Sequence, residues 1–199
     1  MPKAKPLIAF QGISGAYSGI AAQKLYPGCG KLYCPSFEAA LLELDARRAE
    51  RAVIPVTNAL AGPVTNALAA LRKGVYAVEK TLWLPVDHCL LALPGAKMED
   101  LRAVYSHWQA LEQCKKNIAK LKLKPVVAGD TAGAAKQVAE EKDAAKAAIA
   151  SSAAAKEYGL YILRKSFQDL ADNKTLFFAL CLEKKGATPL EEALKKHGL

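Results

Sequence analysis

The sequence predicts an α/β fold, and three observations support that class. Short apolar segments of strand type alternate along the chain with segments whose apolar residues recur at helical spacing. Aromatic residues make up only 7% of the chain while alanine is abundant, which favours helices packed on a sheet over an all-β fold. The 199 residues suffice for one large domain or two small lobes, each with a core. Because strand–helix–strand connections usually join parallel strands, mostly parallel sheets are expected.

The first third of the chain contains three predicted strands, and each leads through a polar or glycine-containing junction into a helix. The strands are expected at 7–10, 31–34 and 51–56, and the helices at 18–26, 37–48 and 64–72. Gly12 and Gly15 permit a tight turn after the first strand. The third glycine of a dinucleotide-binding loop and the Gly-Lys-Ser/Thr of a P-loop are absent there, so nucleotide binding is not expected.

The middle of the chain contains an extended segment at 75–84 and the strongest strand pattern, at 86–93. His88 lies inside that pattern and is interpreted as a core histidine with its hydrogen bonds satisfied. A further apolar run ends at Ser106 and His107, after which apolar residues recur every three or four positions as far as residue 121. We therefore expect one helix over this stretch, with Ser106 as its N-cap.

The last third continues the alternation. Strands are expected at 125–128, 145–150, 161–163 and 176–182, and helices end near residues 141, 158 and 196. Asp130 or Thr131 is the expected cap of the first of these helices, and Thr188 that of the last.

Polar residues recur where the predicted strands give way to helices: Ser18, Asn58, Ser106 and Thr131. In open α/β sheets, ligands bind outside the carboxyl ends of the strands. Helix N-termini, hydroxyls and amides at such ends suit a small anion. The sequence therefore predicts a binding site for a small anionic molecule at these junctions.

Charge and cysteine content exclude several classes of function. The formal net charge is +9, but the lysines and arginines are scattered and no aromatic–glycine RNA motif occurs, which argues against a nucleic-acid-binding surface. The five cysteines are odd in number and none has CxxC spacing, so neither a disulfide framework nor a zinc or other metal site is expected. No apolar segment is long enough for a membrane span, and residues 1–6 lack a signal-peptide core.

Six separate segments, in order, resemble the catalytic domain of prephenate dehydratases. They are 12–18, 55–58 with Gly62, 106–114, 130–135, 148–151 with 158–160, and Gln168-Asp169 with Asn173 and Thr175. Two further segments, 26–29 and 88–95, look more like the arogenate dehydratases of plants and algae. The resemblance extends from about residue 7 to residue 182.

This resemblance implies a two-lobed α/β fold of the type II periplasmic-binding-protein kind, with the active site between the lobes. The first lobe would contain residues 1–80 completed by 177–199, and the second residues 81–176. The implied reaction removes water and carbon dioxide from prephenate or arogenate, giving phenylpyruvate or phenylalanine. It needs no cofactor, because formation of the aromatic ring drives it.

Residue by residue, the resemblance assigns catalysis to Thr175, which would assist departure of the ring hydroxyl. Asn58, Ser106 and Gln113 match substrate-positioning residues, and Ser18, Gln109 and Thr131 are further candidates. The implied ligand is a small dicarboxylate or amino-acid-like substrate. The implied assembly is a homo-oligomer, at least a dimer, or a subunit of a larger complex. The location would be the cytoplasm, or the plastid stroma if a transit peptide has been removed.

The chain also departs from the family pattern. The family usually has Glu-Asn-Ser where this chain has Thr57, Asn58 and Ala59, and an arginine where it has Leu176. Losing an arginine removes a bidentate clamp for a carboxylate. The family's regulatory ACT domain is not expected in residues 183–199. Two hypotheses follow: an active dehydratase with a variant pocket, or an inactive paralogue retained as a binding or scaffold subunit. A third and weaker one, a nucleic-acid-associated protein, rests on the net charge alone.

Overall fold

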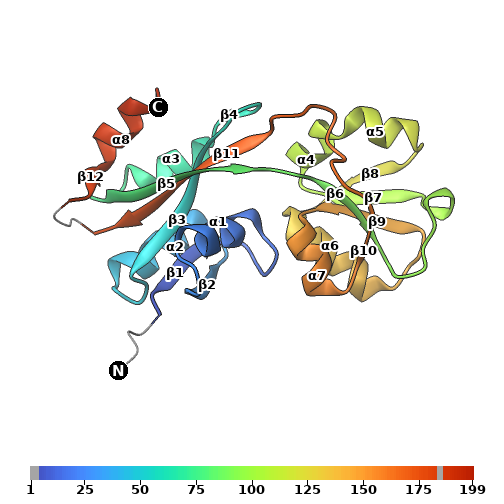
Figure 1. Ribbon diagram of the computed structural model, residues 1–199, viewed down its shortest axis with the longest axis horizontal. Coiled ribbons are helices and arrows are strands. Elements are labelled where there is room, and N and C mark those ends of the chain that lie inside the picture. The colour runs from blue at the N-terminus through green and yellow to red at the C-terminus, as the bar shows by residue number, and fades with distance from the viewer. Residues whose placement is uncertain (1–4, 183–185) are drawn as a thin grey trace. The chain divides into compact units, whose positions relative to one another are not determined.

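A computed structural model describes residues 5–182 and 186–199, which form two compact units (Figure 1). Unit 1 contains residues 5–12, 18–85, 173–182 and 186–199. Unit 2 contains residues 13–17 and 86–172. The expected α/β class is confirmed, since helices and strands alternate in both units.

Unit 1 is built on a mixed sheet of seven strands, whose main path runs β12–β5–β11–β3–β1–β2. A short strand, β4, pairs with β3 off this path. The strands are β1 (Leu7–Gln11), β2 (Gly30–Cys34), β3 (Arg51–Asn58), β4 (Gly62–Pro63), β5 (Ala77–Pro85), β11 (Lys174–Cys181) and β12 (Thr188–Pro189). The helices are α1 (Tyr17–Leu25), α2 (Phe37–Asp45), α3 (Thr65–Leu71) and α8 (Leu190–Lys196).

The core of unit 1 follows from the alternation of side chains along its central strands. Leu176, Phe178 and Leu180 of β11 lie in one buried cluster with Ile54 and Val56 of β3. Apolar residues of α2, α3 and α8 complete this cluster. Because each fully buried large aliphatic or aromatic side chain contributes about 1.5–3 kcal/mol, this face holds the strands in register.

Unit 2 contains a five-stranded sheet in the order β10–β6–β9–β7–β8. Its strands are β6 (Cys89–Ala92), β7 (Ala103–Ser106), β8 (Lys124–Val127), β9 (Lys146–Ala150) and β10 (Tyr161–Arg164). Its helices are α4 (Trp108–Gln113), α5 (Lys115–Lys120), α6 (Thr131–Glu141) and α7 (Ser152–Tyr158), with a 3₁₀ turn at Met98–Asp100.

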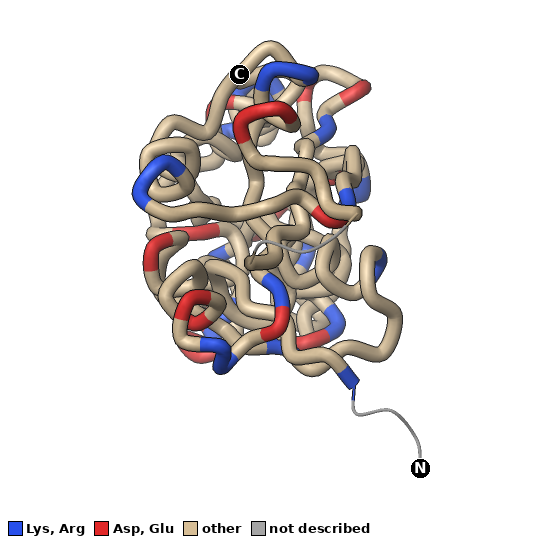
Figure 2. The backbone as a smooth tube through the Cα atoms, turned by 90° about the vertical axis from the view of Figure 1, so that its left-hand side faces the viewer, with Lys and Arg blue, Asp and Glu red and all other residues tan. Residues whose placement is uncertain are grey.

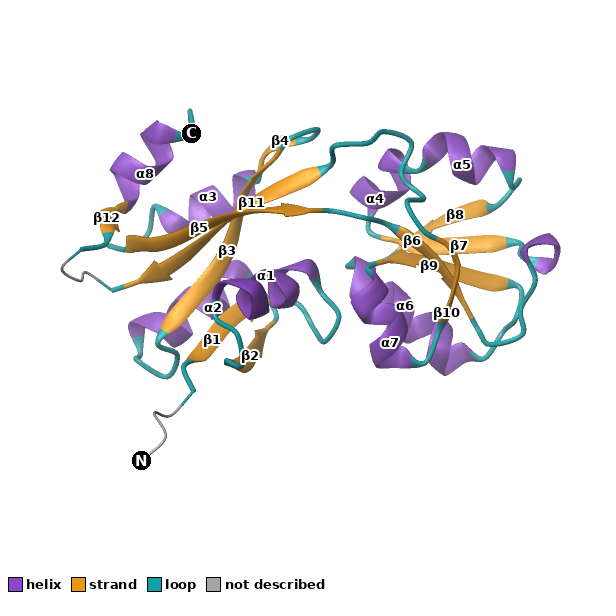
Figure 3. Ribbon diagram, viewed as in Figure 1, coloured by secondary structure: helices purple, strands orange, loops and turns teal. Residues whose placement is uncertain are grey.

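The sheet of unit 2 is covered on both faces (Figure 3). Leu90 and Ile149 point into a cluster with α4 and α5. Leu91 and Ala148, their neighbours along the strands, point into a cluster with α6 and α7. Burial on both faces explains why these strands appear in the sequence as continuous apolar runs.

The expectation of mostly parallel sheets is wrong. Among the described strands, only β1–β2, β1–β3, β7–β8 and β7–β9 pair in parallel, and the remaining pairs are antiparallel. Each sheet contains three parallel strands, and one antiparallel strand pairs with the last of them: β11 with β3 in unit 1, and β6 with β9 in unit 2. In both cases the chain enters this antiparallel strand from the other unit. Such an incoming strand is not bound by the right-handed crossover rule that sets the direction within each trio.

The unit boundaries also differ from the expected lobe boundaries. β5 pairs with β11 from Pro85 opposite Lys174 to Ala77 opposite Cys181, with one register shift between Ala179 and Leu180. A boundary at 80/81 or 176/177 would divide this ladder, so β5 and Thr175 both belong to unit 1. Part of the expected completion of the first lobe, residues 183–185, lies outside the described residues.

Residues 13–17, expected in the first lobe, belong to unit 2 because α7 fixes them there. The Ser151 hydroxyl donates to the Gly15 carbonyl oxygen at 2.6 Å, and the Tyr158 hydroxyl donates to that of Ser14 at 2.8 Å. Gly15 has φ +87°, and a Cβ there would lie 2.6 Å from Cα of Ala154. Only glycine fits this turn without displacing α7.

Two expected helices differ from the prediction. The helix expected from 107 to 121 is interrupted at Cys114 and forms α4 and α5, because Asp169 accepts hydrogen bonds from the backbone N–H groups of Lys116 and Asn117 at the start of α5. The expected cap Thr188 instead pairs with β5 as part of β12, and Pro189 precedes α8.

Candidate active site

The first group of candidate residues lies in unit 1, where β3 ends and β11 begins. Thr175 pairs with Asn58 of β3 on one side and with Leu84 of β5 on the other. Asn173 immediately precedes β11 and is buried. Asn173 and Thr175 are two residues apart in an extended segment, so their side chains share one side of it.

The hydrogen bonds of Asn58 determine the orientation of its side-chain amide. Its Oδ1 accepts from the backbone N–H groups of Leu60, at 3.0 Å, and Ala61, at 2.9 Å. Since a backbone N–H can only donate, the oxygen must face them and the nitrogen must face the opposite side. There Nδ2 lies 2.8 Å from Oδ1 of Asn173, 3.0 Å from Oγ1 of Thr175 and 3.2 Å from the carbonyl oxygen of Lys174.

This orientation has a consequence for the hydroxyl of Thr175. Its oxygen accepts a hydrogen bond from Asn58, so its own proton must point elsewhere. The side chain is half-buried, whereas Asn58 is 9% exposed and Asn173 4%. Unit 1 therefore holds a hydroxyl donor whose orientation is set by the buried amide of Asn58, which in turn is held by Asn173.

Leu176, at the position of the family's usual arginine, is fully buried. Its side chain lies in the core cluster of unit 1, and by strand alternation it points to the face opposite that of Thr175. The residue therefore fills the core in this chain, and the carboxylate clamp considered from the sequence has no counterpart at this position.

Ser106, expected as an N-cap, has a different role. Its hydroxyl is completely buried and donates to the carbonyl oxygen of Ile149 at 2.6 Å, linking β7 to β9. The N-cap of α4 is His107, whose Nδ1 accepts from the backbone N–H of Gln109 at 3.4 Å. The expectation was wrong because β7 extends through Ser106 and directs its hydroxyl into the sheet.

The second group lies in unit 2 and centres on Gln113, the last residue of α4. Its Oε1 is 3.0 Å from Nε2 of His88, a histidine that is 3% exposed. Nδ1 of the same ring lies 3.3 Å from the hydroxyl of Tyr17. Burial lowers the pKa of His88, so its ring is neutral at physiological pH.

Three predicted site residues lie outside these two groups. Thr131 is the first residue of α6, and the helix cap is Asp130, whose Oδ1 accepts from the N–H of Gly133 at 2.8 Å. Gln109 is half-buried in α4, and Ser18 is buried in α1.

Two residues of these groups, Asn173 and His88, were not predicted as site residues. Asn173 could have been found from the sequence, because it lies two positions before Thr175 and shares its side of an extended segment. The partners of His88 lie 71 and 25 positions away, at Tyr17 and Gln113, so no local pattern indicates them.

The chemistry of both groups is that of neutral donors. Amides and a hydroxyl bind carboxylates and hydroxyl oxygens without bringing a fixed charge. Among the residues that the structure describes, no three His, Cys, Asp or Glu side chains are placed to hold a metal ion. In the same part of the chain, no helix is long and apolar enough to cross a membrane.

Comparison with known proteins identifies the family. The prephenate dehydratase family model matches residues 8–185, which is most of the chain, so the chain belongs to the prephenate dehydratase family. It is 45% identical over 177 residues to arogenate dehydratase/prephenate dehydratase 2, chloroplastic, of Arabidopsis thaliana. That match covers 88% of this chain and 46% of the relative, so the chain spans about half the length of this curated relative.

Two solved structures show the same fold. One, described as a quorum-quenching acylase, has a TM-score of 0.82 at 37% identity and covers 89% of this chain and 64% of its own. The other is a prephenate dehydratase from Arthrobacter aurescens in complex with L-Phe, with a TM-score of 0.83 at 24% identity. It covers 89% of this chain and 61% of its own. At that identity, the second likeness concerns the fold alone.

Proposed function

We propose that this chain catalyses the decarboxylating dehydration of prephenate or arogenate, which yields phenylpyruvate or phenylalanine. The proposal is supported by membership of the prephenate dehydratase family. The single observation that carries it is the hydrogen bond from Asn58 Nδ2 to Thr175 Oγ1. That contact orients the hydroxyl at the position where the family resemblance assigns catalysis.

In the proposed reaction, the bond from the ring to its carboxylate breaks, and carbon dioxide leaves. The bonding electrons enter the ring and expel the hydroxyl at the opposite carbon, which becomes water after taking up a proton. Thr175 donates a hydrogen bond to the departing oxygen and so stabilises its developing negative charge. Asn58 keeps the Thr175 proton directed away from its own Nδ2, because the Thr175 oxygen already accepts from that nitrogen.

The substrate carries two carboxylates, and the charge of the chain favours its approach. The net charge of +9 draws anions towards the surface. Lysines and arginines are spread over many elements and interleaved with acidic residues (Figure 2), so this attraction is diffuse. Gln113 is the proposed donor to a substrate carboxylate in unit 2. No charge is required of it, since a hydrogen bond to an ionised group contributes about 1.5–3 kcal/mol.

The experiment that tests the proposal compares Thr175 variants with the unaltered chain. Prephenate and arogenate are supplied separately, and phenylpyruvate and phenylalanine are quantified. We expect Thr175→Ala to lose at least a hundredfold in kcat while its melting temperature falls by no more than about 2–4 °C, the cost of one hydrogen bond, and Thr175→Ser to retain a substantial part of the activity. An N-acyl-homoserine lactone serves as comparison substrate because one curated relative, from Komagataeibacter europaeus, is named as a bifunctional N-acyl-homoserine lactone acylase/prephenate dehydratase. Hydrolysis of its amide bond without any aromatic product from prephenate or arogenate would move the assignment to that activity.

We further propose that the chain acts as a homo-oligomer, at least a dimer, and that it functions in the plastid stroma or the cytoplasm. The family resemblance supports the first part, and the chloroplastic name of the Arabidopsis relative supports the plastid location. Light scattering after size-exclusion chromatography measures the first, with a monomer as the contradicting result. A fluorescent fusion expressed in plant cells measures the second, with a secreted or vacuolar signal as the contradicting result.

A further inference from the structure

Trp108, the first residue of α4, exposes more than half of its indole ring. Its exposed fraction is 56%, and it is one of two tryptophans in the chain. The ring of His107 lies against it, with the two ring centroids 5.7 Å apart and their planes tilted by 43°. His107 is itself fixed, because its Nδ1 accepts from the backbone N–H of Gln109. A large aromatic ring that is held by a fixed neighbour and left exposed is suited to contact another molecule.

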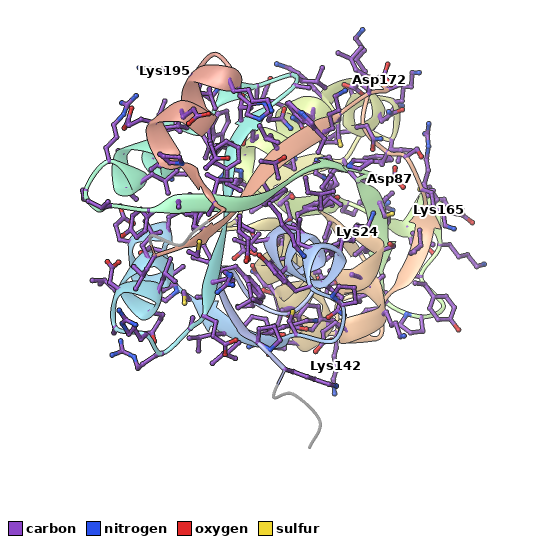
Figure 4. The ribbon with its side chains drawn as sticks, turned by 60° about the vertical axis from the view of Figure 1, so that its left-hand side comes forward. Lys24, Asp87, Lys142, Lys165, Asp172 and Lys195 are labelled. Carbon is purple, nitrogen blue, oxygen red and sulfur yellow. The ribbon has the colours of Figure 1, made fainter. Side chains whose placement is uncertain are left out.

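The position of Trp108 in unit 2 indicates what kind of molecule that is. Strands β7, β8 and β9 are parallel, so all three end at one edge of the sheet, the carboxyl edge, and begin at the other, the amino edge. Figure 4 labels a residue near each edge. Asp87 lies just before β6 at the carboxyl edge, since Cys89 pairs with the last residue of β9, whereas Lys142 lies shortly before the start of β9. Trp108 comes two residues after the end of β7 and therefore lies at the carboxyl edge.

The connections that leave β7 and β9 distinguish one place on the carboxyl edge. After β7 the chain continues into α4 and α5, which pack on one face of the sheet. After β9 it continues into α7, which packs on the opposite face. Because β7 and β9 are neighbours, their connections leave the edge in opposite directions, and this is the switch point at which open α/β sheets bind ligands. Trp108 begins the connection from β7, so it lies where a ligand is expected.

A second exposed apolar side chain lies at the same edge. Val127, the last residue of β8, is 67% exposed and pairs with Ser106, the last residue of β7. Val104, two residues before Ser106, packs with α4 and α5, so by strand alternation Ser106 and its partner Val127 lie on that face too. Trp108 and Val127 thus expose apolar surface at the end of the same strand pair, and such surface suits a carbon ring better than an ionised group.

We propose that Trp108 is a specificity-determining residue that contacts the six-membered ring of prephenate or arogenate. The inference rests on the proposed dehydratase function, and it assigns to this side chain the carbon ring of the substrate and not its carboxylates. The face of an indole covers a ring of similar size, whereas amides and hydroxyls bind the carboxylates. The contact is made with the substrate and with the transition state alike, so it contributes to substrate affinity more than to the rate of the bound complex.

The kinetic test compares two substitutions at Trp108 with a matched control. We expect Trp108→Ala to raise KM about tenfold with little change in kcat, and Trp108→Phe, which keeps an aromatic ring, to recover most of that loss. Tyr161→Ala is the control, because Tyr161 is 61% exposed in the same sheet but lies at the amino edge, where it pairs with Ala92. Its KM should equal that of the unaltered chain. An unchanged KM in Trp108→Ala, or the same increase in Trp108→Ala and Tyr161→Ala, would overturn the inference.

A binding measurement decides the inference independently of turnover. With Trp83→Phe and Thr175→Ala combined, Trp108 is the only tryptophan and the proposed reaction is slowed, so prephenate and arogenate can each be titrated while tryptophan emission is followed. We expect a saturable change in emission with one or both. Succinate, an acyclic dicarboxylate, should cause no such change, and neither substrate should cause one when Trp108→Phe and Thr175→Ala leave Trp83 as the only tryptophan.

The outcomes of the titration separate the possible failures. Emission that responds to succinate as it does to the ring compounds would overturn the inference. Emission that ignores both ring compounds but changes with protein concentration would place Trp108 in a contact between copies of the chain, and would also overturn it. A saturable change in a chain whose unaltered form yields no aromatic product would overturn the proposed function and leave Trp108 as a ring-binding residue, so the two failures are distinguishable.

Discussion

Replacing Asn58 by alanine tests how far the hydroxyl of Thr175 depends on its buried neighbour. The substitution removes five hydrogen-bonding contacts: two accepted by Oδ1 and three made by Nδ2. Leu60 and Ala61, which donate to Oδ1, lie in an exposed turn, so their N–H groups can bind water instead. The cost therefore comes mainly from the three contacts of Nδ2.

The expected loss of stability follows from those three contacts. A hydrogen bond contributes about 1 kcal/mol net, and Nδ2 has two protons to share among three acceptors, so the free energy of unfolding should fall by about 2–3 kcal/mol. For a chain of this length, each kcal/mol lowers the melting temperature by about 2–4 °C. We expect a decrease of about 5–10 °C in Asn58→Ala.

Activity should fall for a separate reason, because the Thr175 hydroxyl loses the donor that orients it. We expect kcat to fall at least tenfold when it is measured well below the lowered melting temperature. Asn58→Asp separates the loss of stability from the loss of orientation. The aspartate still accepts from the N–H groups of the turn, but its carboxylate has no proton to donate to Thr175, so the Thr175 proton would point towards it. This variant should therefore lose activity as well.

The assays are thermal unfolding and turnover of the same samples. Asn66→Ala is the matched control, since Asn66 is exposed in α3 and its Oδ1 accepts from the N–H of Ala67 in the same helix. It should change the melting temperature by no more than about 1 °C. Full activity in Asn58→Ala despite a lowered melting temperature would refute the orienting role of Asn58.

Three further predictions concern packing and ionisation. Leu176→Ala should lower the free energy of unfolding by about 3 kcal/mol in urea titration, against less than about 0.5 for exposed Leu170→Ala; equal costs would contradict a core role. Burial raises the pKa of Cys114 to about 12, so a thiol reagent at pH 8 should label it only in denaturant, and rapid native labelling would be the contrary result. Burial lowers the folded-state pKa of His88 below its unfolded value of about 6.5. The free energy of unfolding should therefore fall as the pH drops below 6.5, by up to about 1.4 kcal/mol per pH unit, because the unfolded chain binds the proton more readily. In His88→Gln, urea titration should not show this part of the decline.

The α/β class and most element positions could be predicted because the signals are local. The apolar runs of β1, β3 and β9 reflect burial of these strands within the sheets. The Ser36 hydroxyl caps α2 by accepting from the N–H of Ala39, only three residues further along the chain. Thr175 and Asn58 were identified from motifs, and the structure places them opposite each other in register. Their chemical roles remain proposals.

The errors concern interactions between distant parts of the chain. The break at Cys114 depends on Asp169, which is 52 positions from its partner Asn117. β5 and β11 are separated by residues 86–172, nearly ninety residues that lie in unit 2. The two strands pair antiparallel because the chain returns from unit 2 in the opposite direction. Leu176 looked like a missing clamp because the sequence identifies the absent arginine but does not show which face of β11 the residue occupies.

The central claim is that this chain removes both water and carbon dioxide from a dicarboxylate ring, and one measurement tests it most directly. Prephenate or arogenate labelled with carbon-13 in the ring carboxylate is incubated with the chain, and labelled carbon dioxide and aromatic product are followed together. Reactions without protein and with Thr175→Ala give the background. The account predicts both products in equal amounts and well above that background. Product formation no faster than the background, from a folded sample and with either substrate, would contradict it.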